Sequence, residues 1–128
     1  MKYVRYQAAI PNSRGTYPGI FALANGLASS GRLSAEDREA WRRANDHADS
    51  AYPDPSAGNA SVYDRDINPT AQAWFKREAQ HILSGLPFYE DLLRRHQVDY
   101  RILCSDDPGT VLYEDDVQIV VMPRSTAG

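Results

Sequence analysis

The feature that most constrains the fold is a run near the end of the chain, residues 109–123, in which two apolar, β-branched segments flank an acidic pair. The pair is Asp115 and Asp116. Strand-forming residues on both sides of a short polar break are typical of a β-hairpin, so the run predicts two strands that turn at these aspartates.

A two-residue loop at the aspartates would also determine which residues face one another across the hairpin. The expected pairs are Leu112 with Ile119, Tyr113 with Gln118, and Val111 with Val120. Apolar side chains then lie on both faces of the ribbon. Because a two-stranded ribbon is marginal in water, this one needs further strands beside it and helices over at least one face.

Hydrophobic periodicity divides the rest of the chain into strands and helices. The expected elements are a strand at 2–8, helices at 20–28 and 34–52, a long irregular segment at 52–68, a helix at 68–86, a short helix at 88–96 and a strand at 98–105. The helix at 68–86 has the clearest apolar stripe, which includes Trp74 and Phe75, and we expect it to pack on the hairpin. These elements predict an α+β fold with a small, mostly antiparallel sheet. In it the first strand joins a C-terminal meander of three strands, covered by about four helices.

Composition limits the class of protein. The 128 residues predict a single domain over 1–128, with residues 124–128 as a frayed tail. A net charge of -3 argues against nucleic acid as a partner, because phosphate contacts need a basic surface. The first residues lack the apolar core of a signal peptide, no apolar run is long enough for a membrane span, and Cys104 is the only cysteine. A soluble, cytoplasmic protein is therefore expected.

The segment between the first strand and the first helix is a candidate anion site. Asn12, Arg14 and Tyr17 lie in it, at a position where unpaired backbone amides and the positive end of a helix dipole would favour an anion. Arg5, on the first strand, would point into the same region or would lie over apolar surface at the rim of the sheet. No nucleotide-binding motif is present, and the alternative is an ordinary turn with a solvated arginine.

The predicted hairpin tip gathers one hydroxyl and three carboxylates, from Tyr113, Glu114, Asp115 and Asp116. A carboxylate beside a tyrosine acts as a general acid or base when burial raises its pKa, which makes Glu114 the best catalytic candidate. The alternative is a solvated turn, because turns favour aspartate for backbone reasons alone.

Other groups with chemical potential have simpler explanations. The three histidines, His47, His81 and His96, lie on different expected helices and form no pair with metal-ligand spacing, so no metal site is predicted. Residues 46–49 run toward Asp54 and would form a cation or acid–base site only if the segment folded back, whereas such residues near a helix end are usually on the surface. Cys104 alternates with Ile102 on the inward side of its strand and is expected in the core.

Two hypotheses about function follow, since no motif determines a reaction or a cofactor. The first is a module that binds another protein through aromatic and acidic surface near the long segment and the hairpin tip; five tyrosines, Tyr3, Tyr17, Tyr52, Tyr63 and Tyr89, are available for such a surface. The alternative is a small enzyme or small-molecule binder that holds an anionic ligand with Arg5, Arg14 and Tyr17, with Glu114 as acid or base. Convergence of these side chains on one pocket would favour the alternative. The sequence leaves the oligomeric state open.

Overall fold

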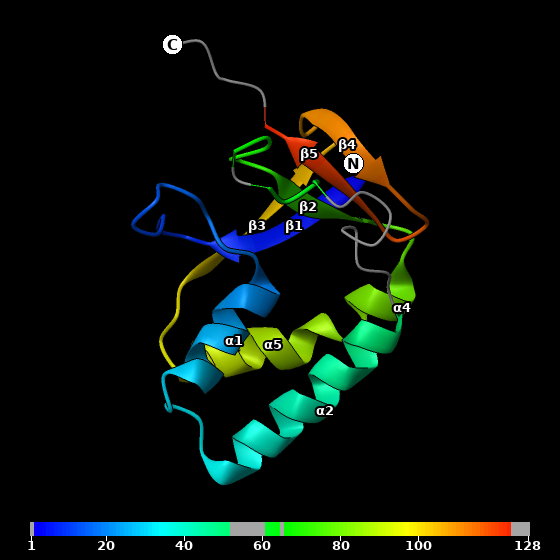
Figure 1. Ribbon diagram of the computed structural model, residues 1–128. Coiled ribbons are helices and arrows are strands. Elements are labelled where there is room, and N and C mark those ends of the chain that lie inside the picture. The colour runs from blue at the N-terminus through cyan, green and yellow to red at the C-terminus, as the bar shows by residue number, and fades with distance from the viewer. Residues whose placement is uncertain (1, 52–60, 65, 124–128) are drawn as a thin grey trace.

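The computed structural model describes residues 2–51, 61–64 and 66–123. A five-stranded antiparallel sheet forms one layer and helices form the other (Figure 1). The elements in chain order are β1 (Tyr3–Ala8), α1 (Ile20–Ser29), α2 (Ala35–Ala51), β2 (Gln72–Lys76), α4 (Gln80–Leu83), α5 (Leu86–Arg95), β3 (Tyr100–Ser105), β4 (Thr110–Glu114) and β5 (Gln118–Met122). The predicted α+β class is confirmed.

The order of strands in the sheet is β3-β1-β2-β5-β4, so β3 and β4 occupy opposite edges although they follow one another in the chain. The predicted meander of the last three strands is therefore wrong. Only residues 106–109 join the two edge strands. Five residue steps reach at most about 18 Å, whereas four strand spacings in a flat sheet come to about 19 Å. The sheet must curl, and Figure 1 shows β4 and β5 folded over β1 and β3.

The segment at 68–86 is not the long helix that its apolar spacing predicted. It contains the strand β2 and the single turn α4. β2 lies between β1 and β5, and its two adjacent aromatic side chains are buried on opposite faces of the sheet: Trp74 is 6% exposed and Phe75 is 8% exposed. A central strand buried on both faces has no alternation, which is why its apolar run resembled a helix. The assignment of both aromatics to the core is confirmed.

Two apolar clusters lie on the two faces of the sheet. On the helix side, α1 and α5 pack against Val4 and Phe75. On the other side, inside the curl of the sheet, Trp74 packs with Ile119 and Val121. The curl thus encloses a second, smaller core that a flat two-layer fold would leave open to solvent.

The helices α1, α2 and α5 occur where helical spacing predicted them. The Ser34 hydroxyl caps α2 by accepting a hydrogen bond from the Asp37 amide at 3.1 Å, as its sequence position suggested. The Asp37 carboxylate binds Arg95 of α5 at 2.9 Å, and Arg95 also binds Asp91. The hydrogen bond from Arg95 lowers the pKa of Asp37. This ion pair holds the end of α5 against the start of α2.

The hairpin of β4 and β5 is confirmed, but its register differs from the prediction. The observed pairs are Thr110 with Met122, Val111 with Val121, Tyr113 with Val120 and Glu114 with Ile119. A bulge at Leu112 shifts the register, and three residues, 115–117, separate the two strands instead of two.

The side chain of Asp115 explains where the turn of the hairpin begins. Its carboxylate accepts hydrogen bonds from the amides of Val117 at 2.8 Å and Gln118 at 3.0 Å, and from the Tyr113 hydroxyl at 2.7 Å. Burial by itself would raise the pKa of Asp115, but these hydrogen bonds outweigh it, and the pKa is lowered. An aspartate whose carboxylate binds the amides two and three residues ahead stabilises a turn that begins at its own position, one residue later than predicted.

The irregular segment predicted at 52–68 is described only at 61–64 and 66–68, where it forms turns, and the Asn68 amide side chain donates to the carbonyl of Ser61. The other residues of that segment, and the tail at 124–128, lie outside the described residues. Among the residues that the structure describes, no helix has both the length and the apolar composition needed to cross a membrane.

Candidate functional site

Arg5, one of the predicted ligand-binding residues, is buried and bonded to protein oxygens. Its guanidinium donates to the Gln7 side chain at 2.8 Å and to the carbonyls of Tyr17 and Ala73 at 2.7 Å each. Burial lowers the pKa of Arg5 to about 10, and the nearby Tyr63 opposes this shift. These contacts tie the 9–19 segment to β2, so Arg5 has a clear structural role.

The predicted anion loop also bonds several of its own amides. The Asn12 side-chain oxygen accepts hydrogen bonds from the amides of Arg14 and Thr16, at 3.0 and 3.1 Å, and from the Thr16 hydroxyl at 3.0 Å. The Gly15 amide donates to the Asn12 carbonyl. The Arg14 side chain is exposed. Amides bonded in this way have no free N–H for an anion.

Glu114 and Tyr113 lie on β4, which β2 and β5 separate from β1. The Glu114 carboxylate is 2.7 Å from the Lys76 ammonium, and their hydrogen bond raises the pKa of Lys76. Tyr113 donates to Asp115. The predicted site residues thus form two groups, one on and after β1 and one on β4, with β2 and β5 between them.

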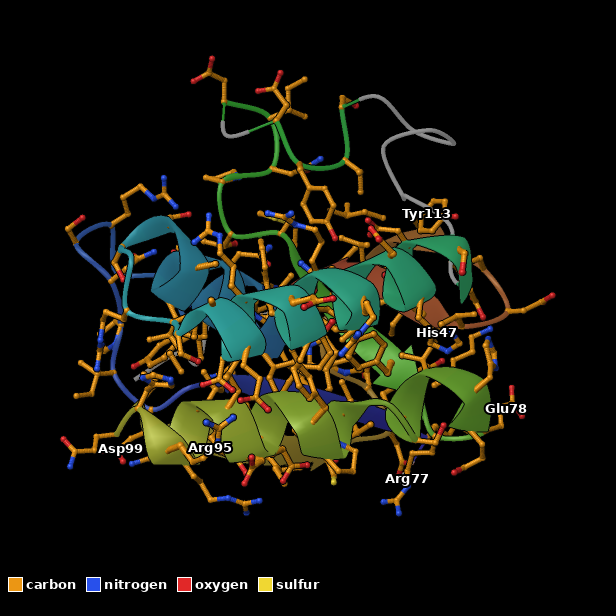
Figure 2. The ribbon with its side chains drawn as sticks, turned by 90° about the horizontal axis from the view of Figure 1, so that it is seen from below. His47, Arg77, Glu78, Arg95, Asp99 and Tyr113 are labelled. Carbon is orange, nitrogen blue, oxygen red and sulfur yellow. The ribbon has the colours of Figure 1, made fainter. Side chains whose placement is uncertain are left out.

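The histidines are also dispersed. His47 and His81 are exposed, and the Nε2 atom of His96 is 3.8 Å from Asp37 (His47 is labelled in Figure 2). Within residues 2–51, 61–64 and 66–123, no three side chains of the types that bind metals gather closely enough to hold an ion. Asp54, toward which the 46–49 cluster was expected to run, lies outside these ranges.

Cys104 is exposed, which corrects its predicted place in the core. The register of β3 with β1 does put Cys104 and Ile102 on the helix side of the sheet, but β3 is an edge strand. Ile102 is accordingly 50% exposed. The guanidinium of Arg77, which Figure 2 shows near α4, lies 3.9 Å from the Cys104 sulfur.

A group of side chains, most of them titratable, surrounds this edge, and we call it the β3–α5 face. Its members are Tyr6 of β1, Arg77 before α4, Glu90 and Arg94 of α5, and Tyr100, Ile102 and Cys104 of β3. The Tyr100 hydroxyl donates to the Glu90 carboxylate at 2.7 Å and so connects the strand to the helix. Cross-strand pairing places Tyr6 beside Ile102.

The two phenols of the β3–α5 face remain protonated at neutral pH. Burial, followed by the charge of Glu90, raises the pKa of Tyr6. Burial and the hydrogen bond to Glu90 raise the pKa of Tyr100. A tyrosine with a raised pKa donates hydrogen bonds but is a poor base, so this face is suited to recognition better than to proton abstraction.

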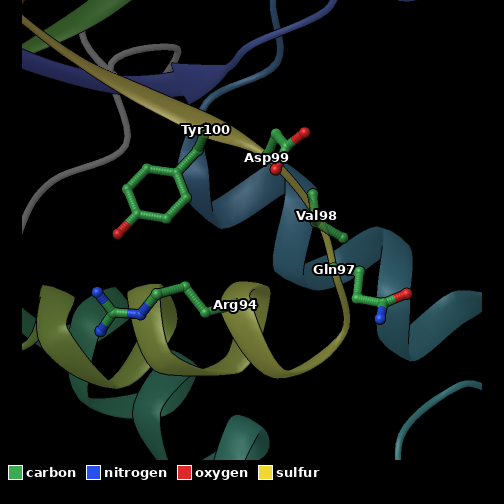
Figure 3. Close-up of a pocket in the computed structure, with 5 residues that line it drawn as sticks. All are labelled: Arg94, Gln97, Val98, Asp99 and Tyr100. Carbon is green, nitrogen blue, oxygen red and sulfur yellow. The ribbon is translucent and has the colours of Figure 1, made fainter.

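One end of the face is hollowed. A depression of about 440 Å³ is lined by Arg94, Gln97, Val98, Asp99 and Tyr100. In Figure 3 the Tyr100 ring projects from β3 toward α5, and the Arg94 side chain extends along the helix below it. Both a phenol ring and a guanidinium are therefore available to a group that enters between strand and helix.

The hydrogen-bonding pattern shows which backbone groups of β3 point away from the sheet. The Ala9 amide donates to the Asp99 carbonyl at 3.2 Å, and these two residues continue the antiparallel register of β1 and β3. Since bonded and non-bonded pairs alternate in an antiparallel ladder, Arg101, Leu103 and Ser105 bond to β1. The N–H and C=O groups of Tyr100, Ile102 and Cys104 point outward. No strand in the described part of the chain pairs with them.

The opposite edge of the sheet is less suited to pairing. β4 carries the bulge at Leu112, and its end is engaged by the ion pair of Glu114 and Lys76. Bulges and charges are common devices that prevent another strand from adding to an edge. β3 has a regular ladder of six pairs with β1 and no bulge.

Sequence reasoning missed this face because it depends on the order of strands. Alternation in 98–105 assigned the correct side chains to the helix side, but only the position of β3 at an edge leaves them exposed. The chain matches no protein-family model, no curated protein and no solved structure.

Proposed function

We propose that the protein is a protein-binding module and that its partner contributes an extended segment, which adds to the sheet as a strand along β3. The observation that carries this proposal is the row of outward N–H and C=O groups at Tyr100, Ile102 and Cys104. Main-chain hydrogen bonds to an exposed edge supply affinity in strand addition, and pockets for alternate side chains supply specificity.

The side chains beside this edge provide such specificity. Ile102, half exposed at the centre of the strand, offers an apolar contact to a residue opposite it. Tyr100 and the depression next to it accept another side chain of the partner segment, two residues along that segment from the one opposite Ile102. At the Cys104 end of β3, Arg77 favours a carboxylate of the partner. A segment with an apolar centre and an acidic end fits these three positions.

The alternative function, an anion binder or small enzyme, has less support in the contacts. It requires Arg5, Arg14 and Glu114 to act on one ligand, whereas Arg5 donates to protein oxygens and Glu114 is paired with Lys76. The amides near Arg14 are already bonded to Asn12. The binding module needs no such rearrangement.

Selection from a library of displayed ten-residue peptides tests the proposal. Peptides that bind the native protein should lose at least tenfold in affinity against Ile102→Pro, which removes one outward N–H and blocks the edge. Proline is tolerated where the N–H faces away from the sheet, so this variant should keep its fold, as circular dichroism would check.

Val111→Lys is the matched control, because Val111 is also 50% exposed on an edge strand, but on β4. It should leave peptide affinity within twofold. Should the proline variant not fold, Ile102→Lys replaces it. Selected peptides that bind the native protein and Ile102→Pro equally well would overturn strand addition at β3.

A further inference from the structure

We infer that the strand that adds to β3 is the β3 strand of a second copy of this chain, which pairs antiparallel about a two-fold axis through Ile102. This inference rests on the proposed function and names the partner at the same edge. An isologous interface requires a surface that is complementary to itself, and β3 meets this requirement in three respects: hydrogen bonding, apolar contact and charge.

The hydrogen-bonding groups match one another in this register. With Ile102 opposite Ile102 of the second copy, Tyr100 lies opposite Cys104 of that copy, and Cys104 opposite its Tyr100. All three residues with outward N–H and C=O groups then form bonded pairs, and each such pair exchanges two backbone hydrogen bonds. Shifting the register by two residues along the strand would leave at least one of these residues without its pair, so the symmetric register satisfies the most backbone groups.

The apolar contact also falls on the axis. Ile102 is 50% exposed on the monomer, and in the symmetric register its side chain meets the same side chain of the second copy on the helix side of both sheets. β-branched cross-strand pairs of this kind stabilise antiparallel sheets. The most exposed apolar side chain of β3 is thereby covered by the same side chain of the second copy.

The β3–α5 face carries charges of both signs at each of its two ends. Glu90 is held at the Tyr100 end through its hydrogen bond, and Arg77 lies at the Cys104 end. The two-fold axis brings the Cys104 end of one copy beside the Tyr100 end of the other. Arg77 of each copy then faces Glu90 of its neighbour, and Arg94 faces the acidic residues 106 and 107 that follow β3 of that neighbour.

The experiment measures the mass of the native protein in solution by sedimentation equilibrium over a range of concentrations from about 1 to 200 µM. Native protein should approach twice the chain mass of 14.3 kDa. Ile102→Pro and Ile102→Lys should remain at the monomer mass, and Val111→Lys, the matched change on the other edge, should behave as native protein. A dimer that persists in both Ile102 variants would overturn the inference.

The single cysteine reports the register. In the symmetric register the two Cys104 Cα atoms are about 14 Å apart, because they are four residues apart along the paired strands. A disulfide needs Cα atoms within about 7 Å. A bismaleimide with a span of about 13 to 16 Å should therefore link the two copies, whereas mild oxidation should not. Rapid disulfide formation at Cys104 would overturn this register.

The outcomes separate this inference from the proposed function. A native protein that stays monomeric at 200 µM overturns the second copy as the partner. If displayed peptides nevertheless bind and lose affinity with Ile102→Pro, strand addition stands with a different protein. If the protein is a dimer that these peptides dissociate, both statements are supported.

Discussion

Substitution of Gly109 gives a sharp test of the curled sheet. Gly109 lies in the link between β3 and β4 and is buried. A Cβ atom placed on it would overlap the carbonyl oxygen of Met122, and would approach the carbonyl carbon of Met122 to 2.8 Å and the Cα of Pro123 to 3.0 Å. These atoms belong to the backbone at the end of β5, so they cannot move aside as a flexible side chain would.

Gly109→Ala should therefore force the start of β4 away from the end of β5. Overpacking of this kind costs about 1 to 3 kcal/mol. For a chain of this size, each kcal/mol lowers the melting temperature by roughly 4 °C, so we expect a fall of about 4 to 12 °C. Urea unfolding followed by tryptophan fluorescence gives the free energy of unfolding directly.

The matched control is Gly26→Ala. Gly26 is exposed within α1, and a Cβ atom there would have no atom within 4 Å. Alanine in a helix interior is favoured over glycine by roughly 0.5 to 1 kcal/mol, so this variant should be more stable than the native protein. The same substitution, glycine to alanine, should therefore lower the free energy of unfolding at position 109 and raise it at position 26. Equal stability of Gly109→Ala and native protein would show that the link does not pass so close to β5.

Two further predictions concern the core and the hairpin. Trp74→Ala should lower the free energy of unfolding by about 3 to 5 kcal/mol, since Trp74 is a large side chain that is 6% exposed; a loss below about 1 kcal/mol would place it on the surface. Asp115 has a lowered pKa in the folded protein, so its contribution to stability is complete above the unfolded pKa of about 3.9 and is lost as the pH falls through the lower folded value. Asp115→Asn should make stability less dependent on pH in that acidic range, as urea titrations at pH 2 to 6 would measure. A pH dependence equal to that of the native protein would contradict this role of Asp115.

Local sequence signals predicted those parts of the fold that local interactions determine. The helix α2 begins after Ser34 because its hydroxyl caps the first turn, and that signal was visible in the sequence. The strand β2 was missed for the opposite reason. Its neighbours β1 and β5 come from the two ends of the chain and bury both of its faces, and nothing within 68–86 reveals them.

The candidate site was less predictable than the fold. The side of the sheet on which Ile102 and Cys104 lie follows from alternation, but their exposure follows from the edge position of β3, which is a property of the whole sheet. The residues that the sequence did propose, such as Arg5 and Glu114, were chosen for their chemistry. Each has protein partners close by that sequence spacing does not show, Ala73 and Tyr17 for the first and Lys76 for the second.

The contrast between the two edges of the sheet is the strongest reason to expect that β3 is covered in the working protein. Monomeric proteins commonly protect exposed edges with bulges, prolines or charges that face the incoming strand. β4 has such protection in its bulge and its ion pair. The only charged residue of β3 is Arg101. Its backbone bonds to β1, and its side chain lies on the face of the sheet opposite the helices. The residues that would meet an incoming strand are a tyrosine, an isoleucine and a cysteine. An edge strand of this composition is suited to pairing with another strand. Without a partner, this unprotected edge would be an aggregation site on the surface of the protein.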